Sequence, residues 1–438
     1  MKNTQINLNT RLTRVNNFGG AHGVACPASA LFLCLLWLAT TYTAFAAPWV
    51  TNVTTSVSGT NVTIKYAISD TNFNSANVYV LVSPDSGNTW AVPATNFSGT
   101  FGRGVAVSAT LATNTIVWNA GTDWPGTNDN NCRVRVVACD NGMVMIPAGS
   151  YNRGDNLDSE SDAPVYSVFI NAFLMDSNLV TYGQWQTVYN WAITNGYSFD
   201  NPGSGKGANY PVVNINWFDA VKWCNARSEM EGVEPEYEDY GVSASQWNTM
   251  RSGRGGYIGV QCLSYYFLLY DPSLNIGYRL PTEAEWEKAA RGGLSGQRFP
   301  WGNTISESQA NYMGATNNGY SYDLGPNGYN SIGSVGGTSP ATSPVGSFPA
   351  NGYGLFDMAG NVNEWCWDNY GSTNYTSGQT NPPGGYYDIG GYENTNSYCV
   401  IRGGSWTNFA SVARCANRGQ LVFTNALNTV GFRCVRGF

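Results

Sequence analysis

Cysteines are the residues of this chain best suited to metal binding or redox chemistry. The sequence has ten of them, and Cys26 and Cys34 lie near its start. Because no two have C-x-x-C spacing, neither a zinc ribbon nor a redox dithiol is expected. An even set of later cysteines indicates disulfides if the protein is exported. The later cysteines are Cys132, Cys139, Cys224, Cys262, Cys366, Cys399, Cys415 and Cys434.

Histidine chemistry is almost absent from the sequence. The one histidine is His22, within an N-terminal segment that has the features of a removable leader. The remaining chain lacks the imidazole that Ser-His-Asp and Cys-His hydrolases need, and it has no histidine ligands for zinc or iron. A hydrolase or transferase that uses carboxylates alone stays open, although no paired carboxylates can be placed from the sequence.

The N-terminus predicts a secretory signal over residues 1–46. Lys2, Arg11 and Arg14 are basic, residues 30–39 are apolar, and residues 44–46 form a small-x-small cleavage site. A membrane anchor is the alternative, but the apolar stretch is shorter than the roughly 20 residues of a span. We therefore expect a secreted, periplasmic or cell-surface protein with no membrane span after cleavage.

Charge argues against nucleic acid as a partner. Removing residues 1–46 takes away three basic residues and no acidic ones, so 22 − 3 = 19 Lys+Arg remain against 29 Asp+Glu, a net charge of −10. Such a surface repels phosphate backbones. The length of 438 residues suits two domains.

The first domain is predicted over residues 47–140 as a small all-β sandwich. Val62, Ile64, Tyr66 and Ile68 alternate with polar residues, as strands with one buried face do. The segments SGNTW at 86–90 and WNAGTDWPG at 118–126 resemble immunoglobulin-like or fibronectin-like modules, which implies spacing or docking rather than chemistry.

Cys132 and Cys139 lie at the end of this domain and could form a disulfide only if the chain between them bends. If one strand joins them, they point to opposite faces and lie roughly 23 Å apart at about 3.3 Å per residue, too far for a disulfide. A bend before Cys139 would allow the bond, so the sequence leaves this pairing open.

The second domain is predicted over residues 143–438, with three helices. Thr181 is suited to cap the first, and the second begins near Asn216 with Trp217, Val221 and Cys224 on one face. The third begins with a capping box formed by Thr282 and Glu285.

Seven motifs in this domain resemble the formylglycine-generating enzyme family, also called sulfatase-modifying factors. The resemblance covers about residues 143–436 and implies an irregular α+β fold, related to C-type lectins, with low secondary-structure content. The motifs are MIPAG at 145–149, NWFDAV at 216–221, YRLPTEAEWE at 278–287, FPWGN at 299–303, GYGLFDMAGNVNEW at 352–365, RGGSW at 402–406 and GFRC at 431–434.

The resemblance implies a lost copper site. The oxidases of the family hold copper(I) with two thiolates just after the Gly-Gly-Ser motif and convert a cysteine of a Cys-x-Pro-x-Arg segment into formylglycine. Ser405 matches their active-site serine, but Asn408 stands at the first cysteine and Ala413 at or near the second. Copper(I) prefers soft sulfur ligands, so copper is not expected here. Cys415 joining Cys399 in a rearranged site is the alternative.

Calcium is the cofactor that the resemblance does imply. One family site would use Asp357, the carbonyls of Gly360 and Val362, and Glu364. A second would use Asn311, the carbonyl of Tyr312, and an acidic or amide group at Asp323 or Asn327. The alternative for the first site is a turn in which the two carboxylates accept hydrogen bonds from backbone amides.

The same resemblance implies a disulfide between Cys224 and Cys415. Four cysteines of the domain then remain, with three possible pairings, and we favour Cys366–Cys399 among them.

The leading functional hypothesis is a non-oxidase, calcium-stabilised binding or scaffold homologue that holds a peptide, protein or glycan in the family groove. The alternative is a copper-dependent formylglycine-generating oxidase with a rearranged thiol site. The iron-dependent sulfoxide synthases that share the domain are excluded, because they need histidines.

Overall fold

The computed structural model describes residues 48–437 except 70–73, 108–111, 127–129, 141, 158–162, 241–246, 253–259, 263–276, 318–319, 335–340, 372–375 and 383–397. The predicted signal peptide lies outside these residues. In the described part of the chain, no helix combines the length and hydrophobicity that a membrane crossing requires.

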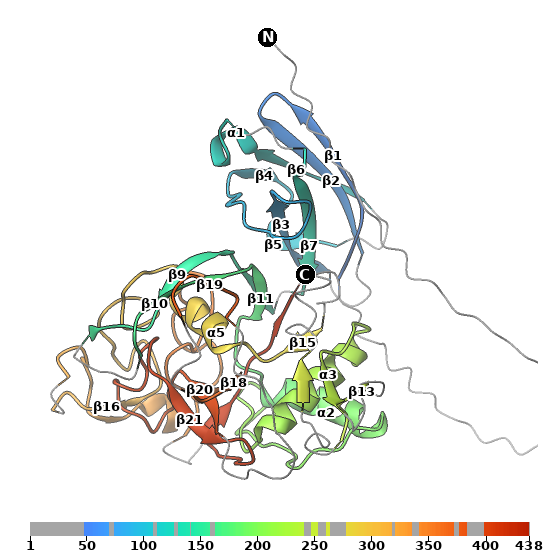
Figure 1. Cartoon of the computed structure of the whole chain (residues 1–438). Coiled ribbons are helices and arrows are strands. Elements are labelled where there is room, and N and C mark those ends of the chain that lie inside the picture. The colour runs from blue at the N-terminus through green and yellow to red at the C-terminus, as the bar shows by residue number, and fades with distance from the viewer. Residues whose placement is uncertain are drawn as a thin grey trace, which may run out of the picture.

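The N-terminal region forms two antiparallel sheets and the short helix α1 (Ala120–Asp123). Alternating residues such as Ile64 and Tyr66 of one sheet and Val78 and Val80 of the other share one apolar core, as the period-2 pattern predicts. Figure 1 shows this region above the rest of the molecule. The first sheet has the order β1 (Trp49–Ser58), β2 (Asn61–Ser69), β6 (Thr113–Asn119), β4 (Phe97–Gly99), and the second has β5 (Gly102–Ala106), β3 (Ser75–Ser83), β7 (Arg133–Cys139).

The second of these sheets is covered on both faces. Leu81, Val137 and Cys139 point away from the N-terminal core and belong to the same apolar cluster as Met143 and Leu174 of the following region. The N-terminal region therefore shares a core with the rest of the chain. Strand β7 is continuous from Arg133 to Cys139, and Cys132, which directly precedes it, lies in a different core from Cys139; the structure therefore resolves a pairing that the sequence left open.

Three longer helices follow, and each begins where the sequence predicts. Thr181, Asn216 and Thr282 cap them, each in a capping box with the residue three positions later. On the second helix, Trp217, Val221 and Cys224 are buried as predicted. The helices are α2 (Tyr182–Thr194), α3 (Trp217–Met230) and α5 (Glu283–Ala290).

Short strands make up the remaining regular structure, consistent with the predicted irregular α+β fold. The 3-10 helix η2 spans Ser331–Ser334. The sheets are β15 (Tyr278–Arg279), β23 (Val435–Arg436), β11 (Phe173–Asp176), β8 (Met143–Ile146); β19 (Gln379–Thr380), β10 (Tyr166–Ile170), β9 (Gly149–Arg153); β21 (Gly419–Val422), β20 (Tyr398–Arg402), β18 (Asn363–Asn369), β22 (Val430–Gly431); β13 (Trp247–Thr249), β12 (Tyr237–Tyr240), β14 (Val260–Cys262); and β16 (Met313–Gly314) with β17 (Gly328–Tyr329).

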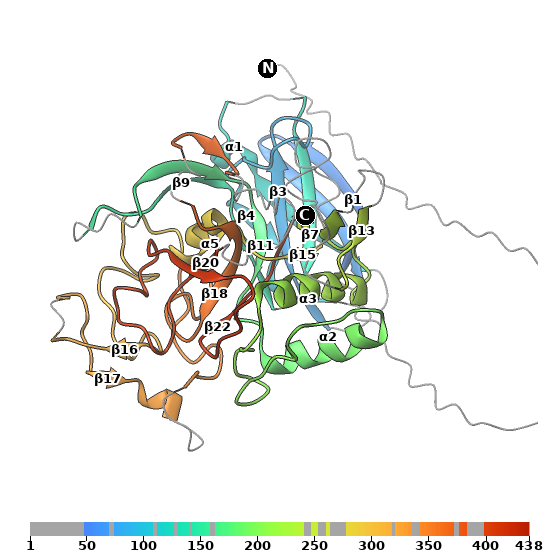
Figure 2. The same ribbon diagram turned by 60° about the horizontal axis from the view of Figure 1, so that its bottom comes forward.

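The sheet of β18 and β20 separates the two main cores of this region. One core packs the aromatic residues of α2 and α3, including Trp185 and Trp223, and the other surrounds Trp286 of α5. Figure 2 shows α2 and α3 side by side, with β16 and β17 in the lobe on the opposite side of the molecule. Ser405 follows the end of β20 by three residues.

Candidate functional site

Ser405 sits in a turn that two glycines create. Gly403 and Gly404 have φ values of +89° and +72°, which residues with a Cβ rarely adopt. A Cβ on Gly403 would also lie 3.1 Å from the ring of Trp286. The chain therefore turns sharply after β20, and the Ser405 side chain is buried.

Asn408 closes this turn through its side-chain oxygen. Oδ1 of Asn408 accepts hydrogen bonds from the backbone N–H of Ser405 at 2.9 Å and from its hydroxyl at 2.7 Å. Asn363 Nδ2 approaches the same oxygen at 3.4 Å, and the hydroxyls of Ser405 and Thr407 are 2.9 Å apart. The neighbours of Ser405 in this turn are thus an amide and a hydroxyl. Sequence reasoning missed Asn363 and Thr407, although Thr407 lies between Ser405 and Asn408 in the sequence.

Ala413 lies in apolar surroundings instead. It is buried in the cluster that contains Phe299, Tyr312 and Ala410. Its backbone N–H donates to the carbonyl of Ala410 at 3.1 Å, so the chain between these alanines forms a tight turn. The methyl group of Ala413 offers no ligand to a metal.

The buried charges of α5 anchor the strand that leads into the Ser405 turn. Arg402, three residues before Ser405, donates to Glu287 at 2.7 Å, and Glu287 also pairs with Arg291 at 2.7 Å. Burial alone would raise the pKa of Glu283, but Arg402, Arg418 and Arg153 lower it to about 2. The Glu283 carboxylate therefore stays ionised and keeps its arginine partners at neutral pH.

The cysteines do not converge on Ser405. The Sγ atoms of Cys224 and Cys434 lie 3.6 Å apart, and both residues are fully buried. Cys415 belongs to the core around Trp286, so the structure does not bring Cys224 and Cys415 together as the resemblance implied. The missed signal was Cys434 in the GFRC motif, whose backbone N–H donates to Asp176 at 3.1 Å.

Cys366 and Cys399 are also kept apart, by the pleat of their sheet. Trp365 pairs with Ile401 across β18 and β20, so Cys366 faces the same side as Val400. Cys399 faces the opposite side, among Trp365 and Trp367. Because neighbouring residues on a strand point to opposite faces, this arrangement separates the two predicted partners.

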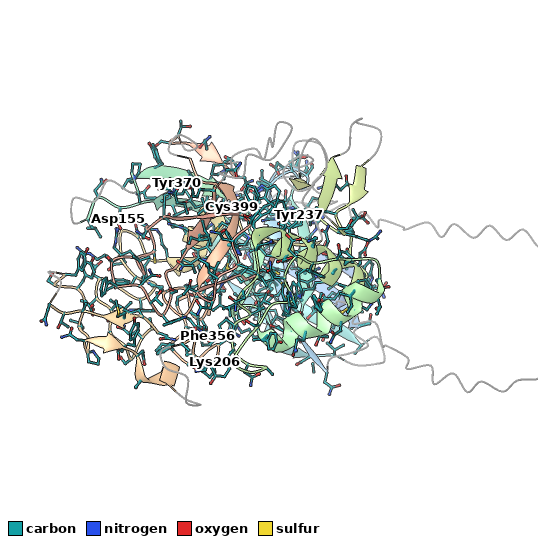
Figure 3. The ribbon with its side chains drawn as sticks, turned by 90° about the horizontal axis from the view of Figure 1, so that it is seen from below. Asp155, Lys206, Tyr237, Phe356, Tyr370 and Cys399 are labelled. Atoms are coloured by element: carbon teal, nitrogen blue, oxygen red, sulfur yellow. The ribbon has the colours of Figure 1, made fainter. Side chains whose placement is uncertain are left out.

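Cys399 and Cys415 likewise belong to different cores, on the two faces of the sheet that contains β20. The carbonyl of Cys415 accepts from Arg402 at 2.8 Å on the face opposite Cys399, and Figure 3 shows Cys399 toward the middle of the molecule. Burial raises the pKa of Cys415 to about 12, and it raises the pKa values of Cys366 and Cys434 well above their ordinary range. These thiols are protonated at neutral pH, whereas copper binds the thiolate.

The residues of the first predicted calcium site lie together, but Glu364 already has a cationic partner. Both of its oxygens accept from Arg433, at 2.7 and 2.9 Å, and both side chains are fully buried. Gly360 and Val362 are buried on the chain between Asp357 and Glu364. Sequence reasoning missed Arg433, although it is part of the GFRC motif.

Within the described residues Asp357 forms no salt bridge, although the charge of Arg433 partly offsets its burial. Its Oδ2 accepts the backbone N–H of Gly346 at 2.8 Å, and Asn361 Nδ2 approaches Oδ1 at 3.4 Å. Burial raises the pKa of Asp357 to about 6. A buried carboxylate with hard oxygen donors and little countercharge suits calcium, so Asp357 fits that ion. Glu364 fits it only if it shares its oxygens with Arg433.

The residues of the second predicted calcium site are held by hydrogen bonds. Asp323 accepts from the hydroxyl of Tyr312 at 2.6 Å and from the N–H groups of Ala315 and Gly325 at 2.7 and 2.9 Å. The carbonyl of Asn311 accepts the N–H of Asn361 at 2.7 Å, so the two predicted metal segments touch. Asn327 instead accepts from Thr316. Across the described ranges, no group of three or more His, Cys, Asp or Glu side chains could hold a metal ion.

Comparison with known proteins places most of the chain in one family. Residues 129–438 match the model of the sulfatase-modifying factor enzyme 1-like domain. Over 297 residues the chain is 31% identical to the serine/threonine-protein kinase pkn1 of Chlamydia caviae, a match that covers 67% of this chain and 38% of that protein. The chain thus spans well under half of the chlamydial protein.

Two other relatives are matched over most of their length. The chaperone protein LppX of Paenibacillus barcinonensis is 27% identical over 296 residues, which cover 67% of this chain and 89% of that protein. The formylglycine-generating enzyme of Bos taurus is 28% identical over 316 residues, which cover 67% of this chain and 74% of that protein.

Proposed function

The chain belongs to the family of the sulfatase-modifying factor enzyme 1-like domain, and we propose that it is a ligand-binding member that performs no copper-dependent oxidation. The observation that carries this proposal is the Ser405 turn. There the amide of Asn408, not a pair of sulfurs, contacts the serine that matches the family's active site. An amide oxygen is a hard ligand, and copper(I) prefers soft ones.

The protonation of the other thiols supports the proposal. The sulfurs of Cys224 and Cys434 are in contact, and both residues are fully buried. The raised pKa of Cys434, which follows from burial and from the contact with Cys224, disfavours a thiolate. A substrate cysteine would have no access to this pair.

The chain also has relatives that are named for different functions. Relatives of the chain include a kinase, a chaperone and a formylglycine-generating enzyme. Because the fold serves several functions, a member without thiols in the active-site turn can act by binding alone. The ligand would be a peptide, protein or glycan held beside Ser405.

The proposal also includes export of the protein and a structural calcium ion. The basic, apolar and small-residue segments of positions 1–46 support signal cleavage and a secreted or periplasmic location. The buried Asp357 carboxylate supports a structural calcium ion, which Asp357 would hold together with carbonyl oxygens of residues 360 and 362.

A copper(I) competition titration of the reduced protein tests the proposal. We expect no one-to-one complex that withstands a chelator of copper(I). The variant C224S removes one sulfur of the close pair, so any binding that it abolishes belongs to that pair and not to the Ser405 turn. The double variant N408C/A413C restores thiols at the two aligned positions and serves as the positive control. Tight binding by wild-type protein that persists in C224S contradicts the proposal.

A further inference from the structure

An aromatic pair lies next to the Ser405 turn. The rings of Tyr329 and Trp406 are 6.0 Å apart and inclined at 53°. Tyr329 is 48% exposed, and Trp406 is partly exposed. Tyr329 on β17 pairs with Met313 on β16, and the N–H of Met313 donates to the carbonyl of Asn408 at 2.9 Å. Backbone contacts therefore fix the aromatic pair beside Asn408.

Polar groups of the same turn are available to a ligand. Asn408 uses its Oδ1 within the turn, whereas its Nδ2 donates to no residue of the described chain. Thr407 is partly exposed, and its hydroxyl bonds that of Ser405. We refer to Tyr329, Trp406, Thr407 and Asn408 as the Trp406 surface. It combines aromatic rings with an amide donor and hydroxyl groups.

The Trp406 surface is uncharged. Its hydrogen bonds and ring contacts within the described residues involve amides, hydroxyls, backbone groups and aromatic rings. A peptide with an arginine would need a carboxylate partner, and these contacts include none. A neutral ligand with many hydroxyls needs aromatic faces for its C–H groups and amides or hydroxyls for its oxygens, and this surface supplies both.

The apolar area continues beyond the pair. The ring N–H of Trp406 donates to the carbonyl of Asn428 at 3.5 Å, which places Leu427, 40% exposed, near the Trp406 loop. Phe409, which follows Asn408, is 36% exposed. These side chains extend the apolar area beyond the aromatic pair, which favours an oligomer over a monosaccharide.

From these observations we infer that the Trp406 surface binds a neutral oligosaccharide. Sugar rings stack against Trp406 and Tyr329, and a sugar hydroxyl accepts from Nδ2 of Asn408. The inference rests on the proposed function, because it needs the position of Asn408 to serve binding and not metal chemistry.

The test uses the full-length protein after removal of residues 1–46. Three neutral hexasaccharides serve as probes: cellohexaose, maltohexaose and laminarihexaose. Binding is followed by calorimetry and by tryptophan fluorescence, and a Cys-x-Pro-x-Arg peptide is titrated in parallel. We expect at least one hexasaccharide to bind saturably. The variants W406A and Y329A should each weaken it roughly 10-fold, as loss of a central aromatic contact does.

Matched variants keep the test decisive. Tyr398 is 41% exposed and lies outside the Trp406 surface, so Y398A should leave the affinity unchanged. Because Tyr329 is on the surface, Y329A is expected to keep the thermal midpoint of the wild type, which circular dichroism checks. N408A should weaken binding, and because it also removes the acceptor that closes the Ser405 turn, its thermal midpoint is measured alongside.

Three results would overturn the inference. The first is that none of the three hexasaccharides binds. The second is that W406A and Y329A bind as tightly as the wild type. The third is that only the peptide binds at this surface. None of these results would show that the protein binds copper through thiolates, so the proposed function would still stand. Thiolate-bound copper, by contrast, would overturn the proposed function whatever the saccharide titration shows.

Discussion

Replacing Glu364 with glutamine should lower the thermal midpoint by roughly 5 °C, even in the absence of calcium. Glu364 and Arg433 form a doubly hydrogen-bonded, fully buried pair. Neutralising one partner leaves the buried guanidinium without its ion-pair partner, which costs about 3–5 kcal/mol. At about 2.1 cal/mol/K per residue, the roughly 390 residues from 48 to 437 have an unfolding entropy of about 0.8 kcal/mol/K. A loss of about 4 kcal/mol thus corresponds to roughly 5 °C.

Differential scanning calorimetry in excess EGTA, and then in calcium, measures this loss. The matched control is E229Q, because Glu229 pairs with Arg251, which is 45% exposed. A surface pair contributes about 0–1 kcal/mol, so E229Q should shift the midpoint by no more than about 1 °C. If E364Q matches the wild type in EGTA and differs only in calcium, Glu364 acts as a metal ligand, and the ion-pair reasoning is refuted.

Three other predictions concern buried titratable groups. Calcium should raise the thermal midpoint of the wild type, and D357N should abolish that rise; an equal rise in D357N would exclude Asp357 as the ligand. Burial lowers the pKa of Lys288 to about 7 from 10.5, so the unfolded chain binds more protons between pH 7 and about 10.5, and stability should increase with pH across that window by on the order of a few kcal/mol. K288M should lack this increase in urea titrations at several pH values, and a parallel pH dependence in K288M would rule out Lys288 as its source. Under oxidising conditions Cys224 and Cys434 should form a disulfide that closes a loop of 210 residues, with a gain of roughly 5 kcal/mol in the chain-entropy model less any strain. Peptide mapping of unreduced protein checks this, and alkylation of both thiols after oxidation would contradict it.

The helices were the most predictable part of this structure. Thr181, Asn216 and Thr282 carry their capping signals within four consecutive residues, so no distant contact was needed to find them. For Cys132 and Cys139 the sequence left the outcome open, because it could not show whether the chain between them bends.

Contacts between distant segments were less predictable. The neighbour of Cys224 is 210 positions away, and sequence spacing cannot distinguish Cys434 from Cys415 as its partner. The partner of Glu364 was hidden for the same reason, because Arg433 lies 69 positions later. The shared core of Leu81 and Val137 with the second region also escaped prediction, since alternation marks a strand's buried face but not a second covered face.

The most direct test of the account is whether the protein oxidises a cysteine. Reduced protein is incubated with copper, oxygen and a Cys-x-Pro-x-Arg peptide, next to a formylglycine-generating enzyme as positive control, and aldehyde is measured by mass spectrometry. Because Asn408 and Ala413 supply no sulfur beside Ser405, the account predicts no aldehyde above the copper-only background. Formation of several aldehydes per protein molecule would contradict it.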